Sequence, residues 1–264
     1  MSKYYYKHGL FGAGISILIY VIFTVLLSQT IESAVISTII LDLSIFLFYL
    51  VVRYSDKQSV LLTDDVVSDF NSDLSFKFPI VLILLIRIMT LTFMFAFPFL
   101  LQSPMFEEYT SAMSECPDFV SVFLALILAP IGEEALMRGL IFSFLRNSIG
   151  TSASVVITSF LFAVLHPTPL HFIMTFCLSV VLCYVYMLTN SFALIVCFHS
   201  FFNMTGYLVM SLEMSQAAIV IFAVISFVLV ILALLFYTAF IRKRLSACRM
   251  YRLPYIDIRW YSVV

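Results

Sequence analysis

Pro130-Ile131-Gly132-Glu133-Glu134-Ala135-Leu136-Met137-Arg138-Gly139 puts three formal charges inside an otherwise apolar run, residues 119–145. A charge at the centre of a bilayer costs at least roughly 2.5–3.5 kcal/mol, so three together need partners and usually mark function. In a helix, Glu134 and Arg138 are four residues apart and share a face, whereas Glu133 points about 100° away. One acid can therefore be neutralised by Arg138 while the other stays free for chemistry. The alternative is a structural ion-pair cluster that braces the bundle.

The composition around this stretch is that of a polytopic membrane protein. Of 264 residues, 63% are hydrophobic and only 11% are charged, and the mean hydropathy is +1.11. Such a chain has no room for a sizeable soluble domain. There is no basic stripe, so no nucleic-acid partner is expected. Cysteines 177, 183 and 197 lie in apolar runs and indicate neither a disulfide framework nor a CxxC metal site.

The apolar runs predict an all-α membrane bundle with about eight transmembrane helices. The expected spans are 9–27, 31–52, 78–101, 119–145, 153–165, 170–188, 192–210 and 217–240. With both termini in the cytoplasm, every Lys and Arg outside the spans falls on the cytoplasmic side, as the positive-inside rule requires. We expect N-terminal helices and loops over 1–118, a functional core over 119–210, and a last helix with a basic cytoplasmic tail over 211–264. A compact chain of this kind is typical of a bacterial plasma membrane.

Two further charges, Asp42 and Arg87, fall inside the second and third expected spans. Counted from the ends of those spans at 1.5 Å per residue, they lie at similar depths in the bilayer. We therefore expect them to pair across two adjacent antiparallel helices and to brace the bundle.

The histidines and one asparagine supply the other polar groups of the core. His166 closes the fifth span, with Phe162 one helical turn before it, and His199 and Asn203 project from one face of the seventh span. Because polar side chains in hydrocarbon need hydrogen-bond partners, this pattern indicates a polar cavity within the bundle. His171 follows a proline turn, and we interpret it as a turn residue.

These residue types suit the hydrolysis of a peptide bond, which needs a base for water, donors for the oxyanion and an acid for the leaving amine. Binding of a divalent metal such as zinc is an open alternative, in which Glu133, His166 and His199 would be the ligands. The HExxH helix signature of zinc proteases is absent, and so is the GxSxG elbow of serine hydrolases.

The three motifs together resemble those of one family. Glu133-Glu134-x-x-x-Arg138, then Phe162-x-x-x-His166, then His199-x-x-x-Asn203 are similar to the ordered motifs of the CPBP (CAAX protease and bacteriocin-processing, or Abi) superfamily, which includes the type II CAAX prenyl endopeptidases. The resemblance implies an eight-helix intramembrane protease core. It also implies that Glu133, helped by His166, activates water, that Glu134 and Arg138 orient Glu133, and that His199 and Asn203 form the oxyanion site. Members are described both as metalloenzymes and as glutamate proteases, and the sequence leaves that choice open.

The resulting hypothesis is an intramembrane endopeptidase acting on a membrane-associated peptide or protein, with membrane lipid as its surroundings. Two alternatives stay open: a non-catalytic membrane protein for bacteriocin self-immunity or regulation, and a transporter, although no inverted repeat is found. The substrate, its prenylation and the oligomeric state do not follow from the sequence.

Overall fold

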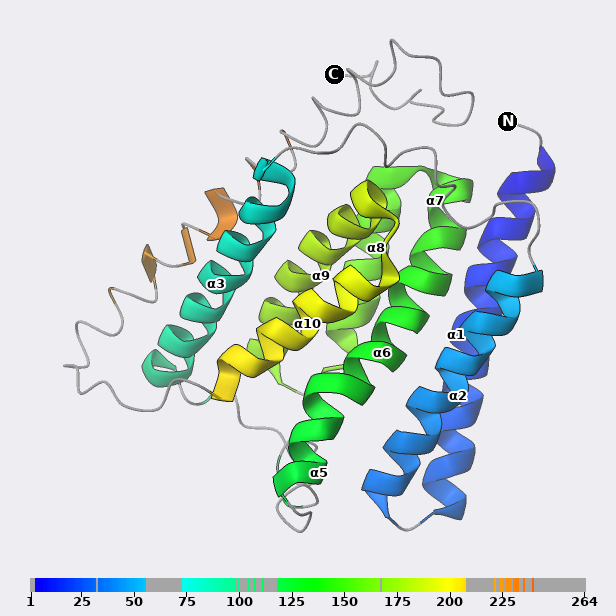
Figure 1. Ribbon diagram of the computed structural model, residues 1–264, viewed down its shortest axis with the longest axis horizontal. Helices are drawn as coiled ribbons and strands as arrows, with labels where there is room; N and C mark the ends of the chain where they lie inside the picture. The colour runs from blue at the N-terminus through cyan, green and yellow to red at the C-terminus, as the bar shows by residue number, and fades with distance from the viewer. Residues whose placement is uncertain are drawn as a thin grey trace.

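A computed structural model of the chain describes residues 3–31, 33–55, 73–97, 118–166 and 168–207, with single positions between 99 and 111 and between 221 and 239. Figure 1 shows a bundle of helices, and the described residues contain no strand. The expected all-α class is therefore confirmed. The elements are α1 (Lys3–Thr30), α2 (Ala34–Ser55), α3 (Asp73–Ala96), α5 (Asp118–Phe123), η3 (Leu124–Leu128), α6 (Ala129–Glu134), η4 (Ala135–Phe142), α7 (Ser143–Ile149), α8 (Thr151–Val164), α9 (Pro169–Thr189) and α10 (Phe192–Tyr207).

Seven of the eight expected spans correspond to helices. Five are long and apolar enough to cross a membrane, and two, within α8 and α10, are shorter. The eighth expected span, 217–240, lies mostly outside the described residues. The cytoplasmic placement of the two termini stays a prediction.

The span with the three charges is one continuous helix in which two segments have π-helical rather than α-helical hydrogen bonds. The segments η3 and η4 have π-helical hydrogen bonding, and the short α6 between them carries both glutamates. Pro130, in the first turn of α6, has no N–H to continue the ladder from the preceding turn. Directly after η4, Ser143 Oγ donates a hydrogen bond of 2.7 Å to the Arg138 carbonyl five residues earlier, so that this carbonyl has a partner. π-Helical turns inside α-helices are frequent at functional sites.

A tight hairpin at Gly150 sets which residues of α7 and α8 meet. Gly150 has φ 84° and ψ 168°, a backbone conformation that favours glycine. Arg138 lies twelve residues before Gly150 and Phe162 twelve residues after it. At 1.5 Å per residue, each is about 18 Å from the turn, so the antiparallel helices bring them to the same depth. Because α8 has only 14 residues, it ends inside the bundle and leaves His166 there rather than at the membrane surface.

Helix α9 is the most buried of the helices long enough to span a membrane. Thr168 caps its N-terminus by accepting a hydrogen bond from the His171 N–H, and Pro169 occupies its first position. Asn190, in the left-handed region at φ 48°, ends it. The chain then turns back at once into α10, which packs on α9, on α3 and on α6.

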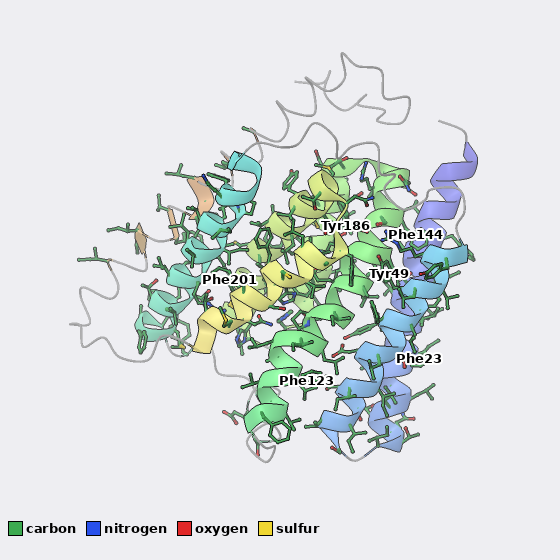
Figure 2. All side chains as sticks on the ribbon, viewed as in Figure 1. Phe23, Tyr49, Phe123, Phe144, Tyr186 and Phe201 are labelled. Carbon is green, nitrogen blue, oxygen red and sulfur yellow. The ribbon has the colours of Figure 1, made fainter. Side chains whose placement is uncertain are left out.

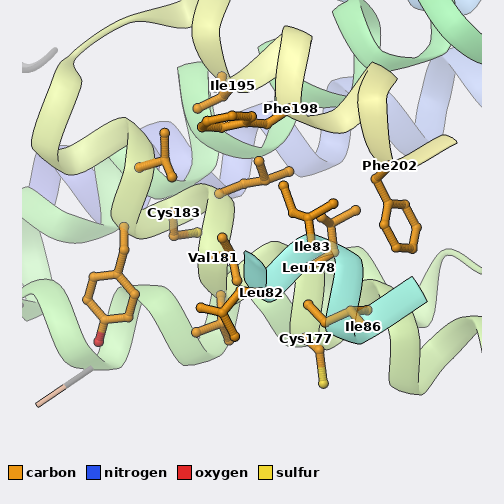
Figure 3. Packing of buried hydrophobic residues seen from close by; sticks show 14 of the residues in the cluster. Leu82, Ile83, Ile86, Cys177, Leu178, Val181, Cys183, Ile195, Phe198 and Phe202 are labelled. Atoms are coloured by element: carbon orange, nitrogen blue, oxygen red, sulfur yellow. The ribbon is translucent and has the colours of Figure 1, made fainter. Parts of the chain in front are cut away.

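Two apolar clusters hold the bundle. One lies among α3, α9 and α10 and includes Ile86, Val181 and Phe202 (Figure 3). The other lies among α1, α2 and η4 and includes Ile45, Tyr49 and Leu140. The charged stretch runs between the two clusters.

Large apolar side chains also cover the outside of the bundle. Phe23 and Phe123 are 40% and 49% exposed, whereas Tyr49 and Tyr186 are buried (Figure 2). Many aliphatic and aromatic side chains of α1, α2, α3 and α8 are exposed in the same way. So much exposed apolar surface fits lipid contact rather than water. The chain is a multi-pass membrane protein.

The expected Asp42–Arg87 pair is wrong. Helix α2 packs on α1, α6 and η4, whereas α3 packs on α9 and α10 at the other side of the bundle (Figure 1). Arg87 donates to the Phe202 carbonyl and, over 3.0 Å, to Thr205 Oγ1, and its guanidinium lies 4.0 Å from the centroid of the Phe202 ring. Backbone and aromatic partners on α10 thus replace the expected carboxylate.

Close packing of η4 on α2 gives a testable consequence at Gly139. A Cβ at this position would lie 2.6 Å from two ring atoms of Tyr49, whose ring stacks on Phe192 with centroids 5.0 Å apart. We expect Gly139→Ala to destabilise the protein by about 1–3 kcal/mol because a packed ring must move. Thermal unfolding in detergent measures this. Gly14→Ala is the matched control: its Cβ would meet nothing within 4 Å, so it should keep or slightly raise the melting temperature. Equal behaviour of the two variants would contradict the packing argument.

Candidate active site

Glu134 and Arg138 form the expected ion pair at the centre of the bundle. Arg138 Nη1 donates to Glu134 Oε1 over 2.8 Å, and both side chains have no exposed surface. The other guanidinium nitrogen, Nη2, donates to the Ser179 carbonyl of α9 over 3.3 Å. The guanidinium carbon also lies 5.0 Å from the centroid of the Phe162 ring. The pair therefore ties η4 to α8 and α9 as well as neutralising one glutamate.

His199 of α10 lies between the two glutamates. Its Nδ1 is 2.8 Å from Glu134 Oε1, and its Nε2 is 3.6 Å from Glu133 Oε2. A carboxylate oxygen only accepts, so Nδ1 carries the hydrogen of the first contact. This bond turns the other ring nitrogen, Nε2, towards Glu133. Glu134 thus holds both Arg138 and His199 through one oxygen, Oε1.

Glu133 differs from its neighbour in accessibility. Its side chain is 34% exposed, whereas that of Glu134 is fully buried. His199, Glu134 and Arg138 are among the groups that act on Glu133 electrostatically. Glu133 is therefore the carboxylate that remains available for chemistry, as the helical spacing indicated.

The rings of His166 and His199 both contact the Phe162 ring. The His166 ring is edge-to-face with the Phe162 ring at 4.8 Å, and the His199 ring is edge-to-face with the same ring at 5.8 Å. His166 Nδ1 is 2.8 Å from the Phe162 carbonyl, which only accepts, so Nε2 is the nitrogen left for other contacts. Phe162 thus fixes the spacing of the two histidines. The direct contact of Glu133 is with His199 rather than with His166.

Asn203 lies one turn after His199 and connects α10 to the π-helical segment before the glutamates. Its Nδ2 donates to the Ala125 carbonyl of η3 over 2.8 Å. One amide hydrogen of Asn203 is therefore committed to holding α10 beside the charged helix. The second amide hydrogen remains for another acceptor.

His171 has a local structural role, consistent with its interpretation as a turn residue. Its N–H donates to Thr168 Oγ1 over 3.1 Å, and its Nδ1 lies 2.9 Å from the same hydroxyl. The residue belongs to the N-terminal cap of α9.

The side chains present do not form a metal site as they stand. Among the described residues, no three His, Cys, Asp or Glu side chains gather closely enough to hold a metal ion. Glu133 Oε2 lies 3.6 Å from His199 Nε2, and both histidine rings contact the Phe162 ring.

Sequence reasoning missed three features of this site. The Ala125 carbonyl accepts a hydrogen bond from Asn203, and the Ser179 carbonyl accepts one from Arg138. Such backbone acceptors cannot be recognised from a pattern of side chains. Asp42 interacts electrostatically with Glu133. As a charge in an apolar run, Asp42 is visible in the sequence, but sequence reasoning pairs it with Arg87 instead.

Comparison with known proteins identifies the segment that contains the site. Residues 116–205 match the family described as type II CAAX prenyl endopeptidase Rce1-like. No curated protein matches the chain, and no solved structure does. The matched segment contains all three motifs, from Glu133 to Asn203. Residues 116–205 are thus similar to the Rce1-like type II CAAX prenyl endopeptidase family, and this similarity covers the segment that holds the candidate site.

Proposed function

We propose that this protein is an endopeptidase that hydrolyses a peptide bond of a membrane-associated peptide or protein, with Glu133 as the general base. The observation that carries the proposal is the position of His199 between a buried, paired glutamate and an accessible one. A structural ion-pair cluster would need only the first of these two glutamates. A second carboxylate, accessible and adjacent to an oriented imidazole, is what hydrolysis requires.

In the proposed reaction, Glu133 removes a proton from a water molecule whose oxygen attacks the carbonyl carbon of the substrate. The new C–O bond places negative charge on the former carbonyl oxygen. His199, when protonated at Nε2, and the remaining amide hydrogen of Asn203 donate to that oxygen. The C–N bond then breaks, and the proton held by Glu133 passes to the leaving amine nitrogen.

The remaining motif residues keep these groups in position. Glu134 orients His199 through its Nδ1 hydrogen, and Arg138 neutralises Glu134. His166 is assigned to the water and the substrate through its Nε2 atom, at a distance from His199 that Phe162 sets. Such pre-organisation lowers the barrier because no group has to reorient during the reaction.

The test uses purified protein in liposomes and a pool of membrane-associated peptides, with and without lipid modification. Cleavage is followed by mass spectrometry, with untreated and chelator-treated samples compared. We expect new peptide ends to appear in the untreated sample. Cleavage that survives the chelator would establish a glutamate-type enzyme, whereas its loss, with recovery when a metal is added back, would establish a metalloenzyme.

A complete lack of cleavage by the wild-type protein across the pool would count against the proposal. It would favour a non-catalytic membrane protein that retains the polar residues as a framework.

A further inference from the structure

Asp42 is a buried carboxyl group to which the three motifs give no role. Its side chain is 8% exposed, and its Oδ2 atom is buried without a hydrogen-bond partner among the described residues. An unpartnered polar group inside a membrane protein is costly, and ionisable residues kept there usually serve function. The expected partner, Arg87, binds α10 instead, so no described residue compensates the cost at Asp42 Oδ2.

The structure places Asp42 directly against the charged helix. A Cβ at Gly132 would lie 2.7 Å from Asp42 Cβ and 2.8 Å from Asp42 Cα. The missing side chain at Gly132 is therefore what lets α2 approach α6 this closely. Glu133, the next residue, interacts electrostatically with Asp42. The carboxyl group thus lies beside the residue proposed as general base.

A third polar group reaches the same place from α1. The Tyr20 phenol interacts electrostatically with both Asp42 and Glu133. Three helices, α1, α2 and α6, therefore bring a phenol and two carboxyl groups together. A buried water needs two to four polar partners, and a phenol and two carboxyl groups are of the types that can provide them.

We propose that Asp42 is a further catalytic residue, whose Oδ2 atom accepts a hydrogen bond from the water molecule that Glu133 activates. This rests on the proposed endopeptidase function. The water donates one O–H to Glu133, which removes that proton, and its other O–H to Asp42. Both hydrogens are then directed away from the substrate, and an oxygen lone pair faces the carbonyl carbon. A carboxyl group has an acceptor oxygen in both its protonation states, so the role does not depend on ionisation.

Two substitutions of Asp42 separate this role from a structural one. Asp42→Asn keeps an acceptor oxygen in place, and Asp42→Leu removes it at similar volume. We expect Asp42→Leu to lower kcat by about 100-fold with little change in KM, because the attacking water loses its orientation. Asp42→Asn should stay within about fivefold of the wild type. The melting temperature of Asp42→Leu should equal or exceed that of the wild type, because the substitution removes an unpartnered buried carboxyl group.

Several results would overturn the assignment. A wild-type kcat in Asp42→Leu would remove Asp42 from the reaction, and an Asp42→Asn variant as impaired as Asp42→Leu would exclude the acceptor role. A lower melting temperature in Asp42→Leu, with activity lost in proportion to folded protein, would make Asp42 a structural brace. If the wild-type protein cleaves nothing, the proposed function itself fails and the assignment falls with it. Rejection of Asp42 alone requires an active wild type.

Discussion

Glu133→Gln is expected to abolish peptide hydrolysis while leaving the fold intact. The amide cannot remove a proton from water, and general-base catalysis contributes typically 10²- to 10⁴-fold in rate. We therefore expect kcat/KM to fall by about 100- to 10,000-fold, measured by mass spectrometry of the cleaved peptides in liposomes. The side chain is 34% exposed and is not part of the Glu134–Arg138 pair. The melting temperature should therefore stay within a few degrees of the wild-type value, about the shift that 1 kcal/mol produces.

Glu107→Gln is the matched control, because Glu107 is exposed and lies outside residues 116–205. It should cleave at the wild-type rate. Wild-type activity in Glu133→Gln would remove the general base from the mechanism. A large fall in its melting temperature, with little folded protein left, would instead show that Glu133 is part of the structural framework.

Arg138→Met is expected to have the largest effect on stability. The change leaves the Glu134 carboxylate fully buried, with His199 as its remaining partner and with Oε2 unpartnered among the described residues. Breaking a buried ion pair by removing one member typically costs about 3–5 kcal/mol, because the remaining charge is uncompensated. Contact with the Phe162 ring and the bond to the Ser179 carbonyl are lost as well. Thermal unfolding in detergent and the amount of protein in membranes measure the effect.

Two companion variants make this prediction specific. Arg53→Met removes an exposed guanidinium that donates to the Tyr49 hydroxyl over 2.7 Å, and it should cost about 1 kcal/mol or less. Combining Arg138→Met with Glu134→Gln removes both charges and should restore part of the lost stability. If the double variant is no more stable than Arg138→Met, the uncompensated charge is not the cause of the loss.

Much of the candidate site could be predicted because it depends on local geometry. The Glu134–Arg138 pair follows from the four-residue spacing on one helix face, and the structure contains it. The distinct environment of Glu133 follows from the same geometry. The contact between Arg138 and Phe162 depends on a single helical hairpin, since both residues lie equally far from the Gly150 turn.

Contacts between helices distant in the chain were less accessible to sequence reasoning. The similar depth estimated for Asp42 and Arg87 says nothing about which helices are neighbours. Helices α2 and α3 lie on opposite sides of the charged helix, so Asp42 and Arg87 have different neighbours. The π-helical segments η3 and η4, which pack against α1, α2 and α10, were equally hidden from sequence reasoning.

The sequence by itself determined that the chain is a helical membrane bundle and which polar residues its core must accommodate. The physical reason is the cost of charges and unsatisfied backbone in lipid, which restricts both the elements and the positions of polar groups. Only the tertiary structure decided that His199 lies between the two glutamates, that the Phe162 ring contacts both histidine rings, and that Asp42 lies against Gly132, the residue before Glu133. These contacts join helices far apart in the chain. They depend on how apolar surfaces and small residues such as Gly132 let helix backbones approach.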